Sequence, residues 1–139
     1  MTIRIEQALN KKLNDFAESF NIFVEWDFYS RGVINPPAGI HLRQSIIPSE
    51  TTIVGMENSG SNSHTGIYQI LVCGGSGNPS IGLKGRVEEI LDLFSRGQLV
   101  EYNGVKVVIE NTSKAAPIYS ESYVKVPVSI RYRSFIGNG

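Results

Sequence analysis

The sequence predicts a single α/β domain of the α+β kind, in which two main helices pack on one mixed, mostly antiparallel β-sheet. Two segments place apolar residues at steps of three and four, which is the spacing of a helix that buries one stripe. Several other segments alternate apolar with polar residues, as strands do. The 139 residues are enough to bury a core without a metal or a disulfide. We therefore expect one domain over residues 1–139.

Two helices are predicted from the apolar spacing and from residues that cap helices. The first covers residues 3–20, with Thr2 as its N-cap and Asn21 as its stop. The second covers residues 79–95, because an Asn-Pro pair stands at its start and Gly97 follows its end. Only one stripe of each helix is apolar, so that stripe is expected to face the core. Its residues are Ile5, Leu9, Leu13, Phe16, Phe20, Val87, Ile90, Leu91 and Phe94.

Alternating and β-branched segments predict the strands of the sheet. The segment 65–73 carries apolar residues on both of its faces, so we expect a strand that is covered on both sides. The Asn103-Gly104 pair is a strong signal for a hairpin turn. Pro127 cannot donate a hydrogen bond to a neighbouring strand, so its strand is expected to lie at an edge or to bulge there. Strands are predicted over residues 22–28, 40–47, 51–53, 65–73, 105–110 and 123–133.

The composition excludes several classes of protein. The 13 basic and 13 acidic side chains balance, with a pI near 6.7, which argues against a general binder of polyanions. Cys73 is the only cysteine, so an intrachain disulfide is excluded and a reducing compartment is expected. No apolar run approaches the roughly 18 residues that a membrane span needs, and the N-terminus lacks the order of a secretory signal. The sequence therefore indicates synthesis in the cytoplasm.

The segment from Gly74 to Lys84 lies between a predicted strand and a predicted helix, where phosphate-binding loops occur. It departs from three known motifs. Leu83 occupies the lysine position of a P-loop, Ser80 occupies a glycine position of the dinucleotide motif, and Asn78 occupies a glycine position of the nucleophile elbow. We therefore interpret this segment as a flexible crossover that leads into the second helix.

The sequence contains no complete set of metal-binding or catalytic residues. His41 and His64 stand 23 positions apart, and Cys73 has no Cys or His at ligand spacing. Cys73 ends a strand that is expected to be covered, where a thiol usually acts as a small apolar side chain. The sequence leaves open a catalytic pair of carboxylates, because any two of the 13 acidic residues could converge in the fold. We predict no bound metal, no cofactor and no intrinsic catalysis.

Two sets of like charges mark faces of the predicted elements. Three basic side chains share one face of the last strand, which can bind phosphate or a partner's carboxylates, or can simply protect an exposed strand from edge pairing. Aromatic residues are too sparse beside them to suggest a platform for single-stranded nucleic acid. Three acidic side chains occupy the expected solvent face of the second helix. The basic set is Lys125, Arg131 and Arg133, and the acidic set is Glu88, Glu89 and Asp92.

One stretch of small and polar residues interrupts the predicted strands. It cannot bury enough apolar surface to order itself, so we interpret it as a mobile loop or hairpin tip. A segment of this kind can become ordered on a partner. The stretch consists of Gly55, Met56, Glu57, Asn58, Ser59, Gly60, Ser61, Asn62, Ser63 and His64.

Taken in order, four segments of the sequence resemble the tail terminator family of long-tailed bacteriophages, also called minor tail or tail completion proteins of the lambda-like type. The first is IEQALNKKLNDFAESFNIFVEWDF, and the second is NPPAGIHLRQSIIPSE. The third is HTGIYQILVCGGSGNPSIGLKGRVEEILDLFSRGQLVEYNGVKVVI, and the last is YVKVPVSIRYR. Together they cover most of the chain.

The resemblance implies a non-enzymatic assembly protein with helices packed on a β-sheet. Members of the family form a hexameric ring that caps the head-proximal end of the tail tube, stops its polymerisation and offers a docking surface to the head. The implied partners are further copies of the chain in a homohexamer, the major tail tube protein and the head-tail connector protein of the neck, with no membrane and no specific nucleic acid. The implied location is the head-proximal end of the virion tail, which is assembled in the host cytoplasm.

The resemblance also suggests roles for the surface features of the chain. A ring interface closes only if two different patches of the subunit are complementary. We therefore hypothesise that the basic and acidic sets lie at the subunit boundary and that the stretch 55–64 contacts the tail tube. The alternatives are a head-tail connector or completion protein of the neck, and a small nucleotide-binding or nucleic-acid-binding domain that uses the segment 74–84 or the basic set.

Overall fold

The computed structural model describes residues 2–26, 40–48, 52–53, 62–75, 81–102, 104–119 and 123–136. Six strands follow one another across the sheet in the order β1-β2-β4-β8-β6-β5, while β3 pairs with β4 and β7 pairs with β8. The β1-β2 pair is parallel and the other pairs in the described residues are antiparallel. The predicted fold of two helices on a mixed, mostly antiparallel sheet is therefore confirmed. The elements are α1 (Thr2–Phe20), β1 (Phe23–Glu25), β2 (His41–Pro48), β3 (Thr52–Ile53), β4 (Asn62–Gly75), α2 (Ile81–Leu93), β5 (Leu99–Tyr102), β6 (Val105–Lys114), β7 (Ile118–Tyr119) and β8 (Tyr123–Ile136).

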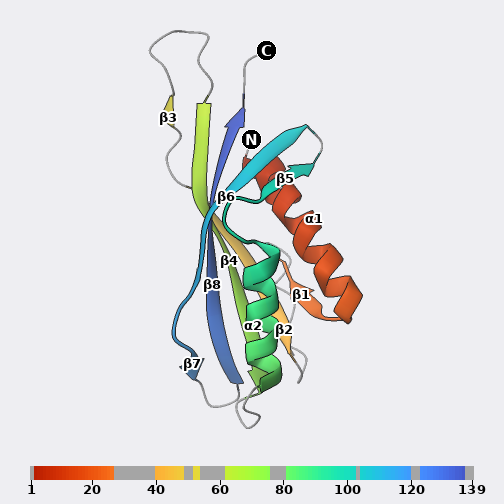
Figure 1. Cartoon of the computed structure of the whole chain (residues 1–139). Coiled ribbons are helices and arrows are strands. Elements are labelled where there is room, and N and C mark those ends of the chain that lie inside the picture. The colour runs from red at the N-terminus through yellow and green to blue at the C-terminus, as the bar shows by residue number, and fades with distance from the viewer. Residues whose placement is uncertain are drawn as a thin grey trace.

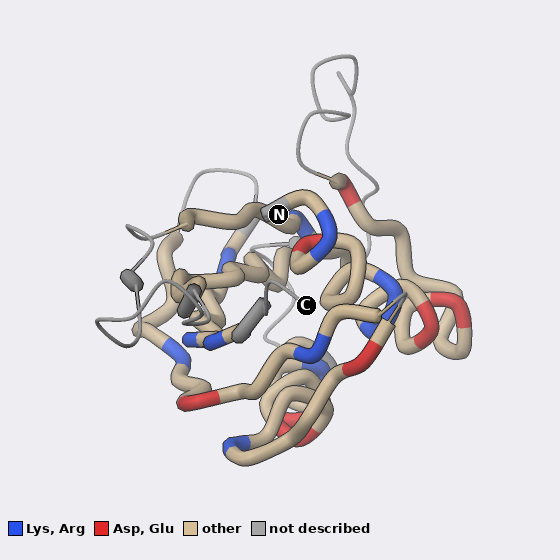
Figure 2. The backbone as a smooth tube through the Cα atoms, turned by 90° about the horizontal axis from the view of Figure 1, so that it is seen from above, with Lys and Arg blue, Asp and Glu red and all other residues tan. Residues whose placement is uncertain are grey.

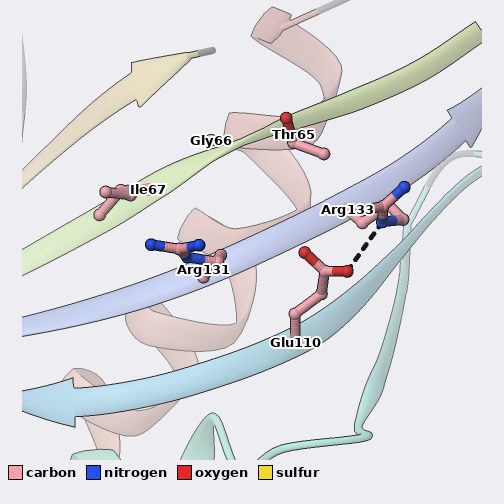
Figure 3. Close-up of a pocket in the computed structure, with 6 residues that line it drawn as sticks. All are labelled: Thr65, Gly66, Ile67, Glu110, Arg131 and Arg133. Atoms are coloured by element: carbon pink, nitrogen blue, oxygen red, sulfur yellow. Dashed lines mark hydrogen bonds and ion pairs between the residues drawn. The ribbon is translucent and has the colours of Figure 1, made fainter. Parts of the chain in front are cut away.

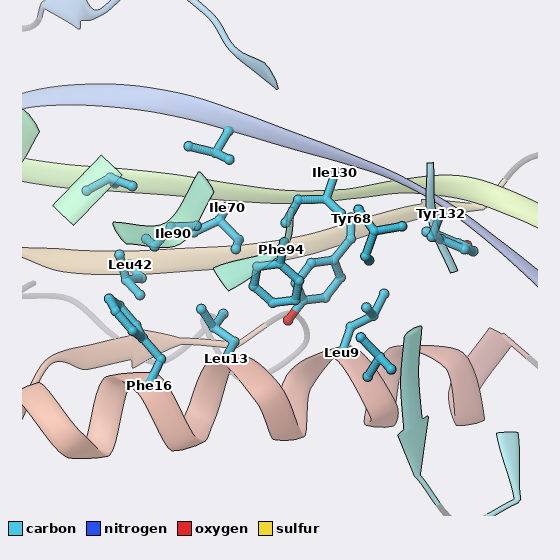
Figure 4. Close-up of a cluster of buried hydrophobic side chains, with 14 of the residues drawn as sticks. Leu9, Leu13, Phe16, Leu42, Tyr68, Ile70, Ile90, Phe94, Ile130 and Tyr132 are labelled. Carbon is cyan, nitrogen blue, oxygen red and sulfur yellow. The ribbon is translucent and has the colours of Figure 1, made fainter. Parts of the chain in front are cut away.

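Both helices lie on the same side of a curled sheet (Figure 1). We call this side of the sheet its inner face and the opposite side its outer face. The even-numbered residues of β4 from 66 to 74 and of β8 from 124 to 134 point to the inner face and are buried. Their apolar side chains form one core cluster with the apolar stripes of the helices. Figure 4 shows the centre of this cluster, with Leu9, Leu13, Phe16, Leu42, Tyr68, Ile70, Ile90, Phe94, Ile130 and Tyr132 labelled.

The first helix ends where the sequence predicted and begins one residue early. Asn21 has a positive φ of 56°, and its N–H donates to the carbonyl oxygen of Glu18 at 3.2 Å. The N–H of Ile22 donates to the carbonyl oxygen of Ala17 at 2.8 Å. These two hydrogen bonds form a Schellman motif, which ends a helix by satisfying its last carbonyl groups. Thr2 lies inside α1, so it is not the N-cap that the sequence predicted.

The predicted core is confirmed at seven of its nine helical positions, and Leu91 is partly buried. The prediction for Phe20 is wrong, because this side chain is 43% exposed at the last position of α1. Its ring packs beside the ring of Phe16, with centroids 5.1 Å apart. The guanidinium of Arg86 lies 4.2 Å from the centroid of the Phe20 ring. Phe20 therefore links the end of α1 to the first turns of α2 through a cation–π contact rather than through burial.

The second helix ends two residues earlier than the sequence predicted, at Leu93. Gly97 lies in the turn that follows, where the N–H of Gln98 donates to the carbonyl oxygen of Ser95 at 3.1 Å. Gly97 occupies the third position of this turn with a φ of 87°. A type II turn requires a positive φ at that position. Gly97 therefore turns the chain toward β5 and does not directly end the helix.

Two polar contacts fix the position of α1 on the inner face. The side-chain amide of Gln44 on β2 donates to the carboxylate of Glu6 at 2.8 Å. The hydroxyl of Tyr68 on β4 donates to the side-chain oxygen of Asn10 at 2.5 Å. Burial raises the pKa of Tyr68 well above its usual value, so its hydroxyl stays protonated and remains a donor. Both contacts sit in the layer between helix and sheet, where an unpaired polar group is costly.

The strand that contains Pro127 lies in the middle of the sheet, and its ladder with β4 continues through Pro127 without a bulge, so both predicted alternatives, an edge strand and a bulge at this residue, are wrong. β8 pairs with β4 along its whole length, whereas its ladder with β6 ends at the pair of Lys114 and Val128. The carbonyl oxygen of Pro127 accepts a hydrogen bond from the N–H of Ala115 at 2.9 Å, just beyond that ladder. In an antiparallel strand the N–H and C=O of one residue point to the same neighbour. The missing donor of Pro127 therefore falls where β6 leaves the sheet.

The remaining strands follow their predicted positions, with differences at their ends. The hairpin turn at Gly104 is confirmed, because Tyr102 pairs with Val105 and Gly104 has a φ of 84°. The strand before this turn, β5, was not predicted, and neither was β7. Gly74 and Gly75 continue β4, although the sequence predicted that the strand ends at residue 73. Residues 27 and 28 of the predicted first strand lie outside the described residues.

Candidate partner-binding surfaces

The outer face of the sheet carries apolar side chains, and neither helix covers it (Figure 1). Ile67 and Leu71 of β4 point to this face and are half-buried. Ile47 of β2 pairs with Ile67 and is 56% exposed. The sequence predicted that the strand at 65–73 is covered on both sides. In the part of the chain that the structure describes, helices cover only its inner side.

A β-bulge in β6 places an acidic side chain on the outer face. Ile109 pairs with Tyr132 and Asn111 pairs with Arg131, so Glu110 is an extra residue between two successive pairs. An extra residue changes which side chains of a strand face the core. Ile109 is buried, whereas Glu110 and Asn111 both reach the outer side. The bulge therefore sets Glu110 beside the basic residues of β8.

A hollow of about 230 Å³ lies on the outer face between β4, β8 and β6. Figure 3 shows its side chains on the side of the sheet away from α1, whose ribbon passes behind. The guanidinium of Arg133 contacts the carboxylate of Glu110 at 2.8 Å across the hollow. Arg131 lines the same hollow, is exposed and makes no ion pair with any described residue. The residues that line it are Thr65, Gly66, Ile67, Glu110, Arg131 and Arg133.

The predicted basic set shares one face of β8, as expected, but does not form one patch. Arg131 and Arg133 are neighbours at the hollow. Lys125 lies six residues away along the strand, which is roughly 20 Å at the rise of a β-strand. It is half-buried opposite Cys73 and interacts with that thiol electrostatically. The structure therefore brings two of the three basic residues together and leaves the third apart.

The predicted acidic set lies on the side of α2 that faces away from the sheet. The carboxylate of Glu88 forms an ion pair with the ammonium group of Lys114 at 3.2 Å, and the carboxylate of Glu89 forms one with the guanidinium of Arg86 at 2.7 Å. Asp92 is exposed and makes no ion pair with any described residue. Exposed pairs of this kind contribute little to stability, so they mainly decide which charges stay available to a partner. Within the acidic set, Asp92 is the residue that the described fold leaves available.

The two charged sets lie on opposite sides of the two-layer fold. The basic set points outward from the sheet, and the acidic set points outward from the helix layer. Over the molecule as a whole, Figure 2 shows basic and acidic residues interspersed along the backbone, in agreement with the zero formal net charge. A molecule without an excess of one sign has no long-range field that steers a charged partner. Recognition by this protein therefore depends on local patches.

The predicted loop from Gly55 to His64 is divided by the structure. Residues 55–61 lie outside the described residues. Asn62, Ser63 and His64 belong to β4, so the loop prediction is wrong for these three residues. Asn62 pairs with Ile136 on one side and with Ile53 on the other. Residues 62–64 therefore form a strand because their backbone pairs with neighbouring strands, although their polar composition did not indicate a strand.

The predicted crossover from Gly74 to Lys84 overlaps the elements on either side of it, because Gly74 and Gly75 belong to β4 and residues 81–84 belong to α2. Residues 76–80, which include the predicted N-cap and first position of the helix, lie outside the described residues. A side chain added at Gly74 would contact Leu83 of α2 at 3.3 Å, so this glycine lets strand and helix pack closely. Cys73 is fully buried, and burial raises the pKa of its thiol to about 11. A thiol with such a pKa is protonated at neutral pH and is a poor nucleophile.

The two histidines do not meet in the described structure in a metal-binding arrangement. His41 is buried on β2 opposite Cys73, and His64 is half-buried near the other end of β4. Among the described residues, no group of three or more His, Cys, Asp or Glu side chains could hold a metal ion. Neither described helix combines the length and the apolar character of a membrane span.

Sequence reasoning missed four of the six residues that line the hollow, which are Thr65, Gly66, Ile67 and Glu110. Glu110 reaches it only because of the bulge, and a bulge leaves no mark in the alternation of residues. Thr65 and Ile67 reach it because β8 lies beside β4, although the two strands are far apart in the sequence. The signal for Ile67 was present as an apolar residue on the second face of a strand, which indicates a covered surface.

Comparison with known proteins shows a solved structure that shares the fold of this chain and identifies the family to which the chain belongs. A search of curated proteins finds no match. A solved structure that is 22% identical, over 100% of this chain and 99% of that protein, superposes with a TM-score of 0.78, which shows the fold alone. The model of the phage tail terminator protein family matches residues 4–132, nearly the whole chain. The chain therefore belongs to the phage tail terminator protein family, a family of structural proteins of the phage tail.

Proposed function

We propose that this tail terminator protein forms a homohexameric ring that caps the head-proximal end of the tail tube. The ring stops polymerisation of the major tail tube protein and offers its other surface to the connector protein of the neck. The family supports a structural role in the phage tail. The observation that carries the ring is the position of the charged sets, because Arg131 and Asp92 lie on opposite sides of the subunit.

A ring of identical subunits needs two different complementary surfaces on each subunit. The outer face supplies a basic and apolar surface with Ile47, Ile67 and Arg131. The exposed side of α2 supplies an acidic surface with Asp92 at its end. Surfaces on opposite sides of a subunit can each meet a neighbour at the same time, and such head-to-tail contacts build a ring when the rotation between subunits closes. This arrangement therefore favours a ring over a pair.

The proposed activity consists of binding and includes no catalytic step. A cap must present a surface to the tube that differs from the surfaces that hold the ring. We assign that contact to the stretch 55–64, of which residues 62–64 extend β4 beyond its partner β2. A polar segment can become ordered on a partner when it gains contacts there. The protein accordingly acts at the end of the virion tail and is assembled in the host cytoplasm.

The mass of the protein in solution tests the ring. Six copies of a 15.3 kDa chain give about 92 kDa, which light scattering coupled to size exclusion distinguishes from a monomer or a dimer. We expect the hexamer to gain population as the concentration is raised. A protein that remains a monomer over the whole concentration range contradicts the ring.

Polymerisation of the tube tests the cap. Tail tube protein is polymerised with and without the terminator, and tube lengths are measured by electron microscopy. We expect tubes to stop growing when the terminator is present and to carry density at one end. Tubes that grow to the same length with and without the protein contradict the proposed function, whatever the mass of the free protein.

A further inference from the structure

We propose that helix α2 of each subunit packs against the outer face of its neighbour, with Asp92 of one subunit facing Arg131 of the next. This inference rests on the proposed ring and goes beyond it, because it names the surfaces and the charge pair at the boundary. It commits the outer face to one occupant, which is a second copy of this chain.

The outer face offers an apolar row beside Arg131. Ile47, Ile67 and Arg131 stand in register on β2, β4 and β8. Neighbouring strands lie about 4.8 Å apart, so the row is about 10 Å wide. Ile47 is 56% exposed and Ile67 is half-buried. Apolar side chains beside an arginine are typical of protein–protein contacts, and their burial by a neighbour gives the second face of β4 the cover that its sequence indicates.

Ion pairs within the subunit select which charges can face a neighbour. Glu88, Glu89 and Arg133 each have an ion-pair partner in their own chain. Lys125 lies roughly 20 Å from the hollow at the rise of a β-strand. Arg131 and Asp92 are exposed, and neither makes an ion pair with a described residue. Of the six charges in the basic and acidic sets, one of each sign is thus left for the boundary, and charge complementarity favours the pairing of these two.

Two partly buried leucines lie to either side of Asp92 around helix α2, because successive residues of a helix point about 100° apart. Leu91 and Leu93, which flank Asp92 in the sequence, are only partly buried by their own subunit. A docking helix needs apolar groups of this kind beside its charge, because an exposed ion pair by itself contributes little. The helix end therefore complements the row of Ile47 and Ile67 in polarity and Arg131 in charge.

Asp92 and Arg131, the two residues of the proposed pair, lie at the same height along the strands of the sheet. Phe94, two residues after Asp92, accepts a hydrogen bond at its carbonyl oxygen from the hydroxyl of Thr112. Thr112 pairs with Ile130, the neighbour of Arg131 in β8. Asp92 and Arg131 are thus on opposite sides of the same part of the sheet. In a closed ring, neighbouring subunits are not displaced from each other along the ring axis. If the strands run along this axis, the Asp92 and Arg131 patches meet this requirement, because they lie at the same height along the strands.

Charge reversal in the full chain tests the pairing. Arg131→Asp and Asp92→Arg are each expected to raise the concentration at which the ring dissociates at least about tenfold, because each creates a like-charge contact. The double variant with both changes is expected to recover most of the ring, since the pair is restored with its signs exchanged. Arg4→Asp and Glu101→Arg are matched controls, because both residues are exposed outside the proposed contact.

A change at Ile47 tests the apolar part of the contact. Ile47→Asn is expected to weaken the ring at least about tenfold, while its exposure keeps the fold of the monomer intact. Far-UV circular dichroism and thermal unfolding confirm the fold of every variant, so that a loss of mass is not mistaken for unfolding.

Each result either supports or overturns the inference. If the wild-type protein remains a monomer, the proposed ring fails and the inference fails with it. If the wild-type ring forms and is unchanged by the single reversals or by Ile47→Asn, the ring stands and this boundary is wrong. If the single reversals weaken the ring and the double variant does not recover, Arg131 and Asp92 do not face each other. Recovery in the double variant together with unchanged controls supports the proposed contact.

Discussion

Gly66 has no room for a side chain, although it lies in the middle of a strand. A Cβ at this position would lie 2.7 Å from the carbonyl oxygen of Ile47 and would overlap the hydroxyl of Tyr132. The oxygen belongs to the backbone of β2, and Tyr132 is buried, so neither can move freely. Gly66→Ala is therefore expected to lower the free energy of unfolding by about 1–3 kcal/mol. Urea unfolding measures this change, and an unchanged midpoint would contradict the close packing.

Three buried groups make the stability of the fold depend on alkaline pH. Burial raises the pKa of Tyr132 to about 12, the pKa of Cys73 to about 11 and the pKa of Tyr68 well above its usual value. All three groups are neutral when protonated, and the unfolded chain loses these protons at a lower pH than the folded chain. The free energy of unfolding is therefore expected to be constant up to about pH 8 and to fall between about pH 9 and 12. The slope is about 1.4 kcal/mol per pH unit for each group that is ionised only in the unfolded chain.

Urea unfolding at a series of pH values checks this dependence, and two variants assign it. Cys73→Ala is expected to make the curve less steep between about pH 9 and 11, and Tyr132→Phe is expected to make it less steep above about pH 10, where Tyr68 still contributes. A wild-type curve that is level up to pH 11 would show that these groups are not held in their neutral forms by the fold.

The second helix contains a glycine that the fold does not require. No described atom lies within 4 Å of a Cβ built at Gly85, and the residue is exposed in the interior of α2. A glycine in a helix interior costs roughly 0.5–1 kcal/mol relative to alanine. Gly85→Ala is therefore expected to raise the free energy of unfolding by about that amount. The same chemical change thus has opposite signs at Gly66 and Gly85, and a decrease on Gly85→Ala in the same urea assay would contradict this assignment.

The helices and central strands could be predicted because burial imposes a period on their residues. The apolar stripe of α1 and the alternation of β8 both follow from one buried side. β5 escaped prediction because only Val100 of its four residues is buried, which leaves no visible period. The bulge at Glu110 escaped because the alternation from 105 to 109 gives no sign of an extra residue. Such features depend on pairing with a distant strand, and a single sequence does not contain that pairing.

For the molecule as a whole, the sequence could predict the sign and the face of the surface charges but not their partners. Lys114 contacts Glu88 across 26 positions of the chain, and Arg133 contacts Glu110 across 23 positions. These contacts exist only once the layers are assembled. Together with the local pair of Arg86 and Glu89 and the distance of Lys125 from the hollow, they reduce the predicted boundary of six charges to one proposed pair, Arg131 and Asp92. Reversal at Arg133 would also remove its ion pair with Glu110 inside the subunit.

Shortening the chain between β3 and β4 is expected to separate capping from ring formation. Residues 62–64 must be kept, because Asn62 pairs with both Ile53 and Ile136, and its removal would shift the strands. The deletion is therefore confined to Asn58–Ser61, within the polar stretch. The proposed boundary between subunits lies on α2 and the outer face, so the shortened chain should keep the mass of the ring. It should lose the ability to stop tube growth, because the segment assigned to the tube is incomplete.

The matched control for this deletion is Arg131→Asp, which leaves the stretch between β3 and β4 unchanged and alters the proposed boundary. Light scattering and tube lengths by electron microscopy are measured for both proteins. At a concentration where the wild-type ring is intact and the weakened ring dissociates, the control is expected to lose the ring, and with it the cap, because the proposed cap is the ring itself. If the shortened chain loses its ring, or still stops tube growth, the stretch between β3 and β4 does not have the separate role assigned to it. Loss of capping by a shortened chain that keeps its ring supports a tail terminator whose tube contact and subunit boundary lie on different parts of one fold.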